Sequence, residues 1–251
     1  MSKPQPTKDF WLAALRADGD AFRAAVTGDA PLTARVPTCP EWTVSDLVRH
    51  LARIYGYVWR HVSRGVTDLP EPFELAADVD VVEAWTEEFT ELLAALDAVD
   101  PDLPAYNWAP QAKKAAFWPR RMAHETAIHR WDAQMATGLA EPIEVRLAVD
   151  GVSEVLDTWL PAGRRVVETP DRLGMIALHA TDADEVWYVR LRGTGVALLD
   201  TDTLLDDDDR HERVTASGPA SDLMLALWGR VAFDNLMVGG DAALLEGLRT
   251  G

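Results

Sequence analysis

The sequence predicts a helical bundle followed by a smaller α+β domain, and three observations lead to this fold class. In the first part of the chain, apolar residues recur at spacings of three and four, which is typical of amphipathic helices. Beyond Gly138, stretches of alternating apolar and polar residues indicate strands. With 251 residues, of which 48% are hydrophobic, the chain is long enough for two modest domains. We therefore expect domains over residues 1–139 and 140–251.

The first domain is expected to contain four helices joined by long loops. A loop over residues 31–42 precedes the second helix, and Thr43 and Asp46 have the spacing of a capping box at its start. The fourth helix has Pro119 in its first turn and continues through Met135, with Gly138 as a natural stop. The first three helices are expected over residues 7–25, 45–61 and 81–96.

The second domain is expected to combine a small sheet with helices. Its strands are predicted over residues 173–180, 185–192, 195–199 and 212–217. Its helices are predicted over residues 144–160, from Gly218-Pro219 through Arg230, and over residues 242–249. We interpret the acidic run Asp206–Asp209 as a solvated loop and not as a metal site, because consecutive carboxylates repel each other and point in different directions.

Composition and charge exclude several classes of partner and site. The formal net charge of −17 repels phosphate backbones and anionic membranes, so we expect no nucleic-acid or membrane partner. A single cysteine, Cys39, excludes an intrachain disulfide framework and a cysteine-based zinc knuckle. The sequence contains neither a signal-peptide pattern nor a run of about 18 apolar residues. We therefore expect a cytoplasmic protein.

The densest polar cluster lies on the predicted fourth helix, between Arg121 and Asp132. Glu125 and His129 are four residues apart, so their side chains project from the same face and could share a metal ion. His50 is the best third ligand, because it interrupts an apolar stripe of the second helix. Two histidines and one glutamate would leave an open coordination position, as catalytic zinc sites require.

Each of these residues also has a purely structural interpretation. His50 could be a core histidine bonded to a carbonyl, and Glu125 could form an ordinary helix-surface pair with Arg121 or His129. For Asp132 we favour a salt bridge with Arg130 or a lysine over a role in orienting His129. Trp42 is expected to be a packing residue.

Two pairs of motifs resemble a known family. The segment Cys39-Pro-Glu-Trp-Thr-Val-Ser-Asp-Leu-Val-Arg-His50 and the segment from His124 to Asp132 resemble the mycothiol-dependent maleylpyruvate isomerase family, which is similar to DinB-like metal-binding four-helix bundles. The segments 216–230 and 239–248 resemble the sterol-carrier-like α+β domain of that family. The resemblance implies a divalent metal ion, usually zinc, held by His50, Glu125 and His129. It also implies that Arg230 binds or polarises the substrate.

The resemblance implies an enzyme that uses mycothiol as thiol cosubstrate. A zinc ion bound by two neutral imidazoles and one carboxylate keeps a net charge near +1, which would lower the pKa of a thiol in the open position. The thiolate would then isomerise or modify a small electrophilic substrate, which could carry a carboxylate. The alternatives are a metal-binding protein with a ligand-binding or regulatory role, and a metal hydrolase that needs no thiol.

Overall fold

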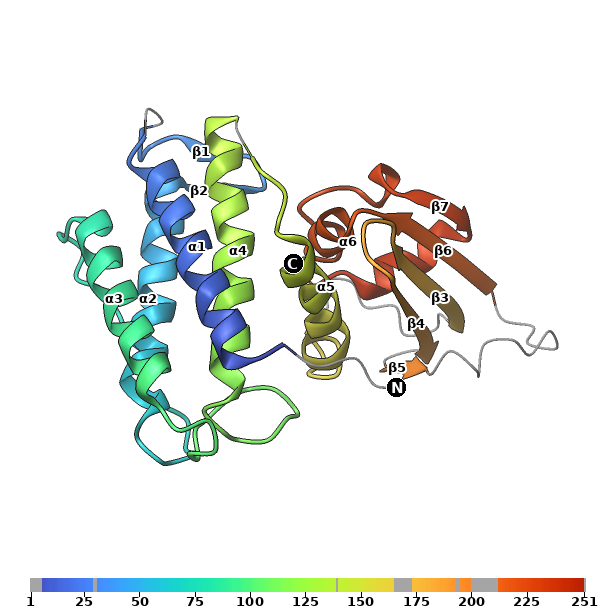
Figure 1. The fold of residues 1–251 in the computed structure, drawn as a ribbon. Coiled ribbons are helices and arrows are strands. Elements are labelled where there is room, and N and C mark those ends of the chain that lie inside the picture. Colours follow the sequence, from blue (N-terminus) through green and yellow to red (C-terminus); the bar gives the residue numbers. More distant parts are fainter. Residues whose placement is uncertain are drawn as a thin grey trace. The chain divides into compact units, whose positions relative to one another are not determined.

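The computed structural model describes residues 6–28, 31–138, 140–164, 173–192, 195–199 and 212–250. The chain forms two compact units, Met1–Glu141 and Pro142–Gly251 (Figure 1). The first unit is helical and the second contains a sheet with helices, which confirms the predicted fold class. Within the described ranges, no helix is long and apolar enough to cross a membrane.

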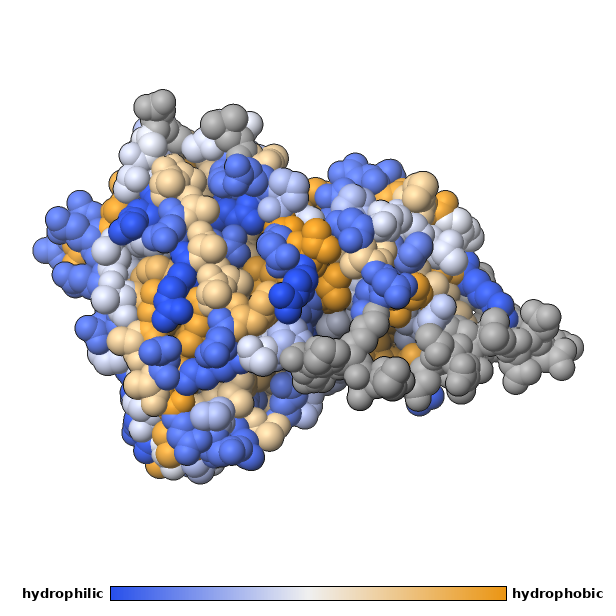
Figure 2. All heavy atoms as spheres, in the orientation of Figure 1, coloured by the Kyte–Doolittle hydropathy of each residue, from blue (hydrophilic) through white to orange (hydrophobic). Residues whose placement is uncertain are grey.

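The first unit is built from four long helices, α1 (Lys8–Val26), α2 (Val44–Val62), α3 (Val81–Ala98) and α4 (Phe117–Thr137). Helix α1 packs against α4, helix α2 packs against α3, and α2 also contacts α4. Hydrophilic residues are spread over the visible outer face of this unit (Figure 2). The apolar stripes face inward, as the spacing of three and four requires.

Aromatic side chains fill the centre of the bundle. Trp85 and Phe89 of α3 stack with their ring centroids 5.0 Å apart, and Phe22 of α1 lies 5.1 Å from Trp85. The buried hydroxyl of Tyr55 on α2 forms a 2.6 Å hydrogen bond with the hydroxyl of Thr126 on α4. This buried polar bond fixes the register between α2 and α4, because a shift would leave both hydroxyl groups without a partner.

The ends of α2 and α4 follow the local sequence. At the start of α2, the Thr43 hydroxyl accepts a hydrogen bond from the Asp46 amide and the Asp46 carboxylate accepts one from the Thr43 amide, which confirms the predicted capping box. The Asp46 carboxylate also accepts a 2.6 Å hydrogen bond from the Thr43 hydroxyl, and the bonds that it accepts from the Thr43 hydroxyl and amide lower the pKa of Asp46. Helix α4 ends at Gly138, whose φ of 76° lies in the left-handed region that favours glycine.

The segment before α2 differs from the prediction of an irregular loop. It forms a small antiparallel hairpin of β1 (Arg35–Val36) and β2 (Cys39–Thr43), in which Arg35 pairs with Thr43 and Val36 pairs with Cys39. The strands are too short to show an alternating pattern, and Pro40 lowers the strand propensity of β2. Contacts of β1 with α4, and of both strands with α2, hold the hairpin on the bundle.

The second unit contains a five-stranded sheet in the order β5-β4-β3-β6-β7. Strands β3 and β6 are parallel, and all other neighbours are antiparallel. Helix α6 (Ala220–Leu227) packs on β3 and β6, and the indole of Trp187 on β4 donates a 2.9 Å hydrogen bond to Ser153 of α5 (Val145–Glu154). The strands span Leu173–Ala180 (β3), Glu185–Arg192 (β4), Gly195–Leu199 (β5), Glu212–Gly218 (β6) and Met237–Gly240 (β7).

The predicted helices over residues 144–160 and 242–249 are present, and the structure defines their types. Helix α5 covers Val145–Glu154 and continues as a π-helical turn over Val155–Trp159, and residues 242–248 form a 3₁₀-helix and not an α-helix. Strand β7 was not predicted, because its Gly239-Gly240 pair gives no strand signal. The acidic run at 206–209 lies outside the described residues.

Helix α6 (Ala220–Leu227) is also shorter than predicted, and it ends before Arg230. Gly229 has a φ of 69°, and the amides of Gly229 and Arg230 bond to the carbonyls of Ala226 and Leu225. This pattern is a Schellman motif, which stops a helix at a left-handed glycine.

The capping box predicts a measurable cost of losing the Thr43 hydroxyl. We expect Thr43→Ala to lower the free energy of unfolding by about 1 kcal/mol, because an amide in the first turn of α2 loses its acceptor. Urea denaturation followed by circular dichroism measures this change. The control is Thr90→Ala, since the exposed Thr90 hydroxyl bonds to the Thr86 carbonyl inside α3, and we expect a change within about 0.5 kcal/mol. Equal losses in the two variants would contradict the capping argument.

Candidate metal centre

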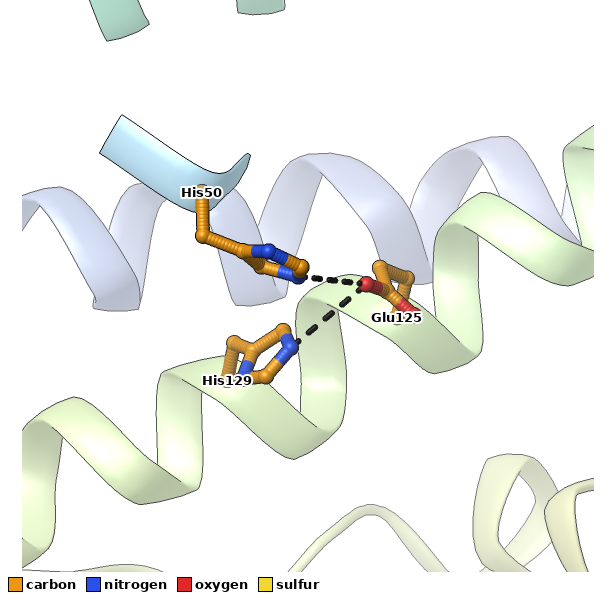
Figure 3. A group of neighbouring side chains, drawn as sticks. All are labelled: His50, Glu125 and His129. Atoms are coloured by element: carbon orange, nitrogen blue, oxygen red, sulfur yellow. Dashed lines mark hydrogen bonds and ion pairs between the residues drawn. The ribbon is translucent and has the colours of Figure 1, made fainter. Parts of the chain in front are cut away.

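Helices α2 and α4 bring the three sequence-predicted ligands together. His50 projects from α2, and Glu125 and His129 project from successive turns of α4 toward it (Figure 3). One potential ligand atom from each residue lies within 4.8 Å of the other two. His50 and Glu125 are 75 positions apart in the sequence, and they are neighbours because α2 packs on α4.

The spacing of the donor atoms suits a small divalent cation. The Oε1 atom of Glu125 lies 3.1 Å from Nε2 of His50 and 3.5 Å from Nε2 of His129. Two ligands that each lie about 2.0–2.1 Å from a tetrahedral zinc ion are separated by about 3.4 Å. Two imidazole nitrogens and one carboxylate oxygen also form a donor set that zinc accepts. The residues therefore fit a zinc ion.

Arg121 holds the second oxygen of the Glu125 carboxylate. Its Nη2 donates a 2.7 Å hydrogen bond to Oε2, and the side chains of Arg121 and Glu125 are only 3% and 13% exposed. Burial by itself raises the pKa of Glu125, but hydrogen bonds with His129 and His50 and the charge of Arg121 hold this pKa well below its usual value. Glu125 is therefore an anion that keeps Oε1 directed at the two histidines.

Asp132 fixes the orientation and tautomer of His129, which corrects our expectation of a salt bridge with Arg130. Nδ1 of His129 donates a 2.9 Å hydrogen bond to the fully buried carboxylate of Asp132, which leaves Nε2 to face Glu125. Arg130 instead donates to Asp18, at 2.9 Å. Burial lowers the pKa of His129, but hydrogen bonds with Asp132 and Glu125 outweigh this effect and raise the pKa. In the sequence, only the spacing of three residues between His129 and Asp132 indicated this pair.

Trp42, which the sequence predicts to be a packing residue, packs against two of the candidate ligands. Its indole lies beside the rings of both histidines, with centroid distances of 4.9 Å to His50 and 6.2 Å to His129. No periodic pattern marks Trp42, because it belongs to the short strand β2. It borders the candidate metal centre.

Arg230, to which the family resemblance assigns the substrate, and Arg60 of the first unit have different surroundings. Arg230 lies in the second unit, just beyond α6, where its half-buried side chain donates a 2.9 Å hydrogen bond to the Trp228 carbonyl. Arg60 of α2 forms a two-point ion pair with Glu88 of α3, at 2.6 and 2.9 Å, and its guanidinium lies over the ring of Phe73. Arg60 therefore joins helices and a loop of the first unit.

Comparisons with known proteins match both units. Residues 12–134 match the family model of the mycothiol maleylpyruvate isomerase N-terminal domain, and residues 146–247 match that of the MDMPI C-terminal domain. The comparison with curated proteins gave no match.

Among solved structures, the fold is similar to the crystal structure of a mycothiol-dependent maleylpyruvate isomerase. The TM-score is 0.62 at 13% sequence identity, over 93% of this chain and 93% of that chain. A mutant of a mycothiol-dependent maleylpyruvate isomerase gives a TM-score of 0.61 at 12% identity, again over 93% of both chains. At this identity the likeness establishes the fold.

The hydrogen bond between Asp132 and His129 predicts a pKa change in metal-free protein. Since the Asp132 carboxylate raises the pKa of His129, we expect Asp132→Asn to lower it, as measured by NMR titration of the imidazole signals. A raised pKa stabilises the fold below the pKa of unfolded histidine, and this stabilisation is lost as the pH rises through the folded pKa. We therefore expect Asp132→Asn to lower the free energy of unfolding at pH values below the pKa of unfolded histidine, where the stabilisation by the raised pKa of His129 is fully present.

The control for this titration is Asp18→Asn, which changes a carboxylate bound to Arg130 and not to His129. We expect the pKa of His129 to stay near its wild-type value in this variant. An unchanged pKa in Asp132→Asn would show that the hydrogen bond to Asp132 does not control the charge of His129.

Proposed function

Because this chain belongs to the mycothiol maleylpyruvate isomerase family, we propose that it is a metal-dependent enzyme that uses mycothiol as its thiol cosubstrate. The observation that carries the proposal is the convergence of His50, Glu125 and His129 from α2 and α4. The substrate in this proposal is a small electrophilic molecule, and the reaction is an isomerisation or an S-transfer.

In this proposal the ligand set would consist of His50, Glu125 and His129, with zinc as the ion. When bound, zinc would lower the pKa of a thiol that enters the open position, which makes a thiolate available near neutral pH. Arg121 would keep the Glu125 carboxylate charged and oriented, and Asp132 would keep Nε2 of His129 directed at the centre.

The thiolate would act as a nucleophilic catalyst in the isomerase version of the reaction. It adds to the activated double bond of the substrate, rotation occurs about the resulting single bond, and elimination returns the thiolate and the trans isomer. In the transferase version, the thiolate displaces a leaving group or remains attached to the electrophile.

We assign substrate binding to Arg230. The guanidinium group is planar and always charged, and it matches the geometry of a carboxylate or a developing enolate. Its place after the Schellman ending of α6 fixes the backbone from which the side chain extends. A carboxylate-bearing substrate is therefore the class that we favour.

The first experiment combines metal analysis with kinetics. We expect protein purified without a tag or chelator to contain near-stoichiometric zinc, and to turn over maleylpyruvate, as the first probe substrate, only with both zinc and mycothiol. His129→Ala should lose the metal and the activity, because a ligand is removed. His179→Ala, an exposed histidine of β3, is the matched control and should keep both.

Each failure of this experiment has a distinct meaning. Folded protein that takes up no zinc would overturn the metal-dependent mechanism and favour a binding protein of the same fold. Zinc-dependent turnover that ignores the thiol would favour a metal hydrolase in which water takes the open position.

The role of Arg230 can be tested separately from the metal. We expect Arg230→Gln to lower kcat/KM by about 10- to 100-fold, because a charge-assisted hydrogen bond to the substrate is lost, and to leave the zinc content unchanged. The control is Arg192→Gln, at the exposed end of β4, which should leave kcat/KM near the wild-type value. Wild-type kinetics in Arg230→Gln would show that this side chain does not bind the substrate.

A further inference from the structure

The β1–β2 hairpin places an indole ring against both candidate histidine ligands. The ring of Trp42 lies 4.9 Å from that of His50 and 6.2 Å from that of His129, and the two imidazoles are themselves 4.9 Å apart. Three rings from β2, α2 and α4 therefore form one cluster.

The same hairpin also contacts the carboxylate that orients His129. The hydroxyl of Thr38, in the turn between β1 and β2, donates a 2.6 Å hydrogen bond to Oδ1 of Asp132. The other oxygen, Oδ2, accepts the hydrogen bond from Nδ1 of His129 and lies 3.9 Å from Sγ of Cys39. Asp132 is fully buried, so these contacts decide the orientation of its carboxylate.

We propose that the β1–β2 hairpin is the positioning element of the metal centre, with Trp42 and Thr38 as its two positioning residues. Trp42 acts directly on His50 and His129, and Thr38 acts on His129 through Asp132. This inference rests on the proposed function, because it supposes that the two histidines bind a metal ion. It assigns a role to a segment in which the sequence pattern indicates only a loop.

The two residues work by different physical means. An imidazole that binds a divalent cation takes a share of the positive charge, and the face of an indole attracts positive charge. Trp42 thus favours the metal-bound state as well as the correct ring orientation. Thr38 occupies one lone pair of the Asp132 carboxylate, which keeps the other oxygen aligned with Nδ1 of His129.

Pairs of substitutions separate positioning from mere packing. Thr38→Val keeps the shape of the side chain and removes the hydroxyl, whereas Thr38→Ser keeps the hydroxyl. Trp42→Ala removes the ring, whereas Trp42→Phe keeps an aromatic face. The control variants are Thr90→Val, at an exposed site of α3, and Trp108→Phe, whose half-buried ring packs on Phe117.

The readouts are the affinity for Zn²⁺, from competition with a chromophoric chelator, and the visible absorption of Co²⁺ in the same site. We expect Thr38→Val and Trp42→Ala each to weaken Zn²⁺ binding by about tenfold or more and to shift the Co²⁺ bands, because the ligands are no longer held in position. Thr38→Ser, Trp42→Phe and both controls should keep most of the affinity and the wild-type spectrum.

The results distinguish this inference from the proposed function. Wild-type protein that binds zinc, together with Thr38→Val and Trp42→Ala variants that bind it equally well, would overturn the role of the hairpin and leave the proposed function intact. Wild-type protein that binds no zinc would overturn both. If Trp42→Ala does not fold, the comparison of Thr38→Val with Thr38→Ser still tests the role of the hairpin, because valine and serine differ little in volume from threonine.

Discussion

The charged carboxylate of Glu125, placed between two helices, is the constraint on which the first unit depends. An anion that is only 13% exposed destabilises a fold unless donors surround it. Arg121 satisfies one oxygen, and His50 and His129 face the other. Loss of a single partner would leave a buried charge incompletely satisfied, so the bundle has to hold α2 and α4 in one register.

The rest of the bundle enforces that register. The buried bond between Tyr55 and Thr126 links α2 to α4 close to the candidate ligands, because Tyr55 lies five residues after His50 and Thr126 directly follows Glu125. The stacked rings of Trp85 and Phe89 fill the core beside it. The capping box at Thr43 sets where α2 begins, seven residues before His50. The packing of the helices and the capping box at Thr43 therefore also determine the distances between the donor atoms of the candidate ligands.

The second unit is organised around a sheet and not around a buried charge. Its sheet contains a parallel pair, β3 and β6, between antiparallel neighbours. Helix α6 packs on β3 and β6, and Trp187 of β4 bonds to Ser153 of α5. The Schellman motif after α6 places Arg230 beyond the helix and not on it. Under the proposed function, His50, Glu125 and His129 would hold the metal ion and Arg230 would bind the substrate.

Local patterns in the sequence determined the four long helices, the capping box at Thr43, the stop at Gly138 and the strands β3, β4, β5 and β6, because each depends on neighbours within a few residues. The same patterns placed Glu125 and His129 on one face. Tertiary structure alone decided how closely His50 approaches them and how the hairpin places Trp42 and Thr38 beside His129 and Asp132. These contacts join residues from separate elements, and no periodicity along the chain records which elements will pack together.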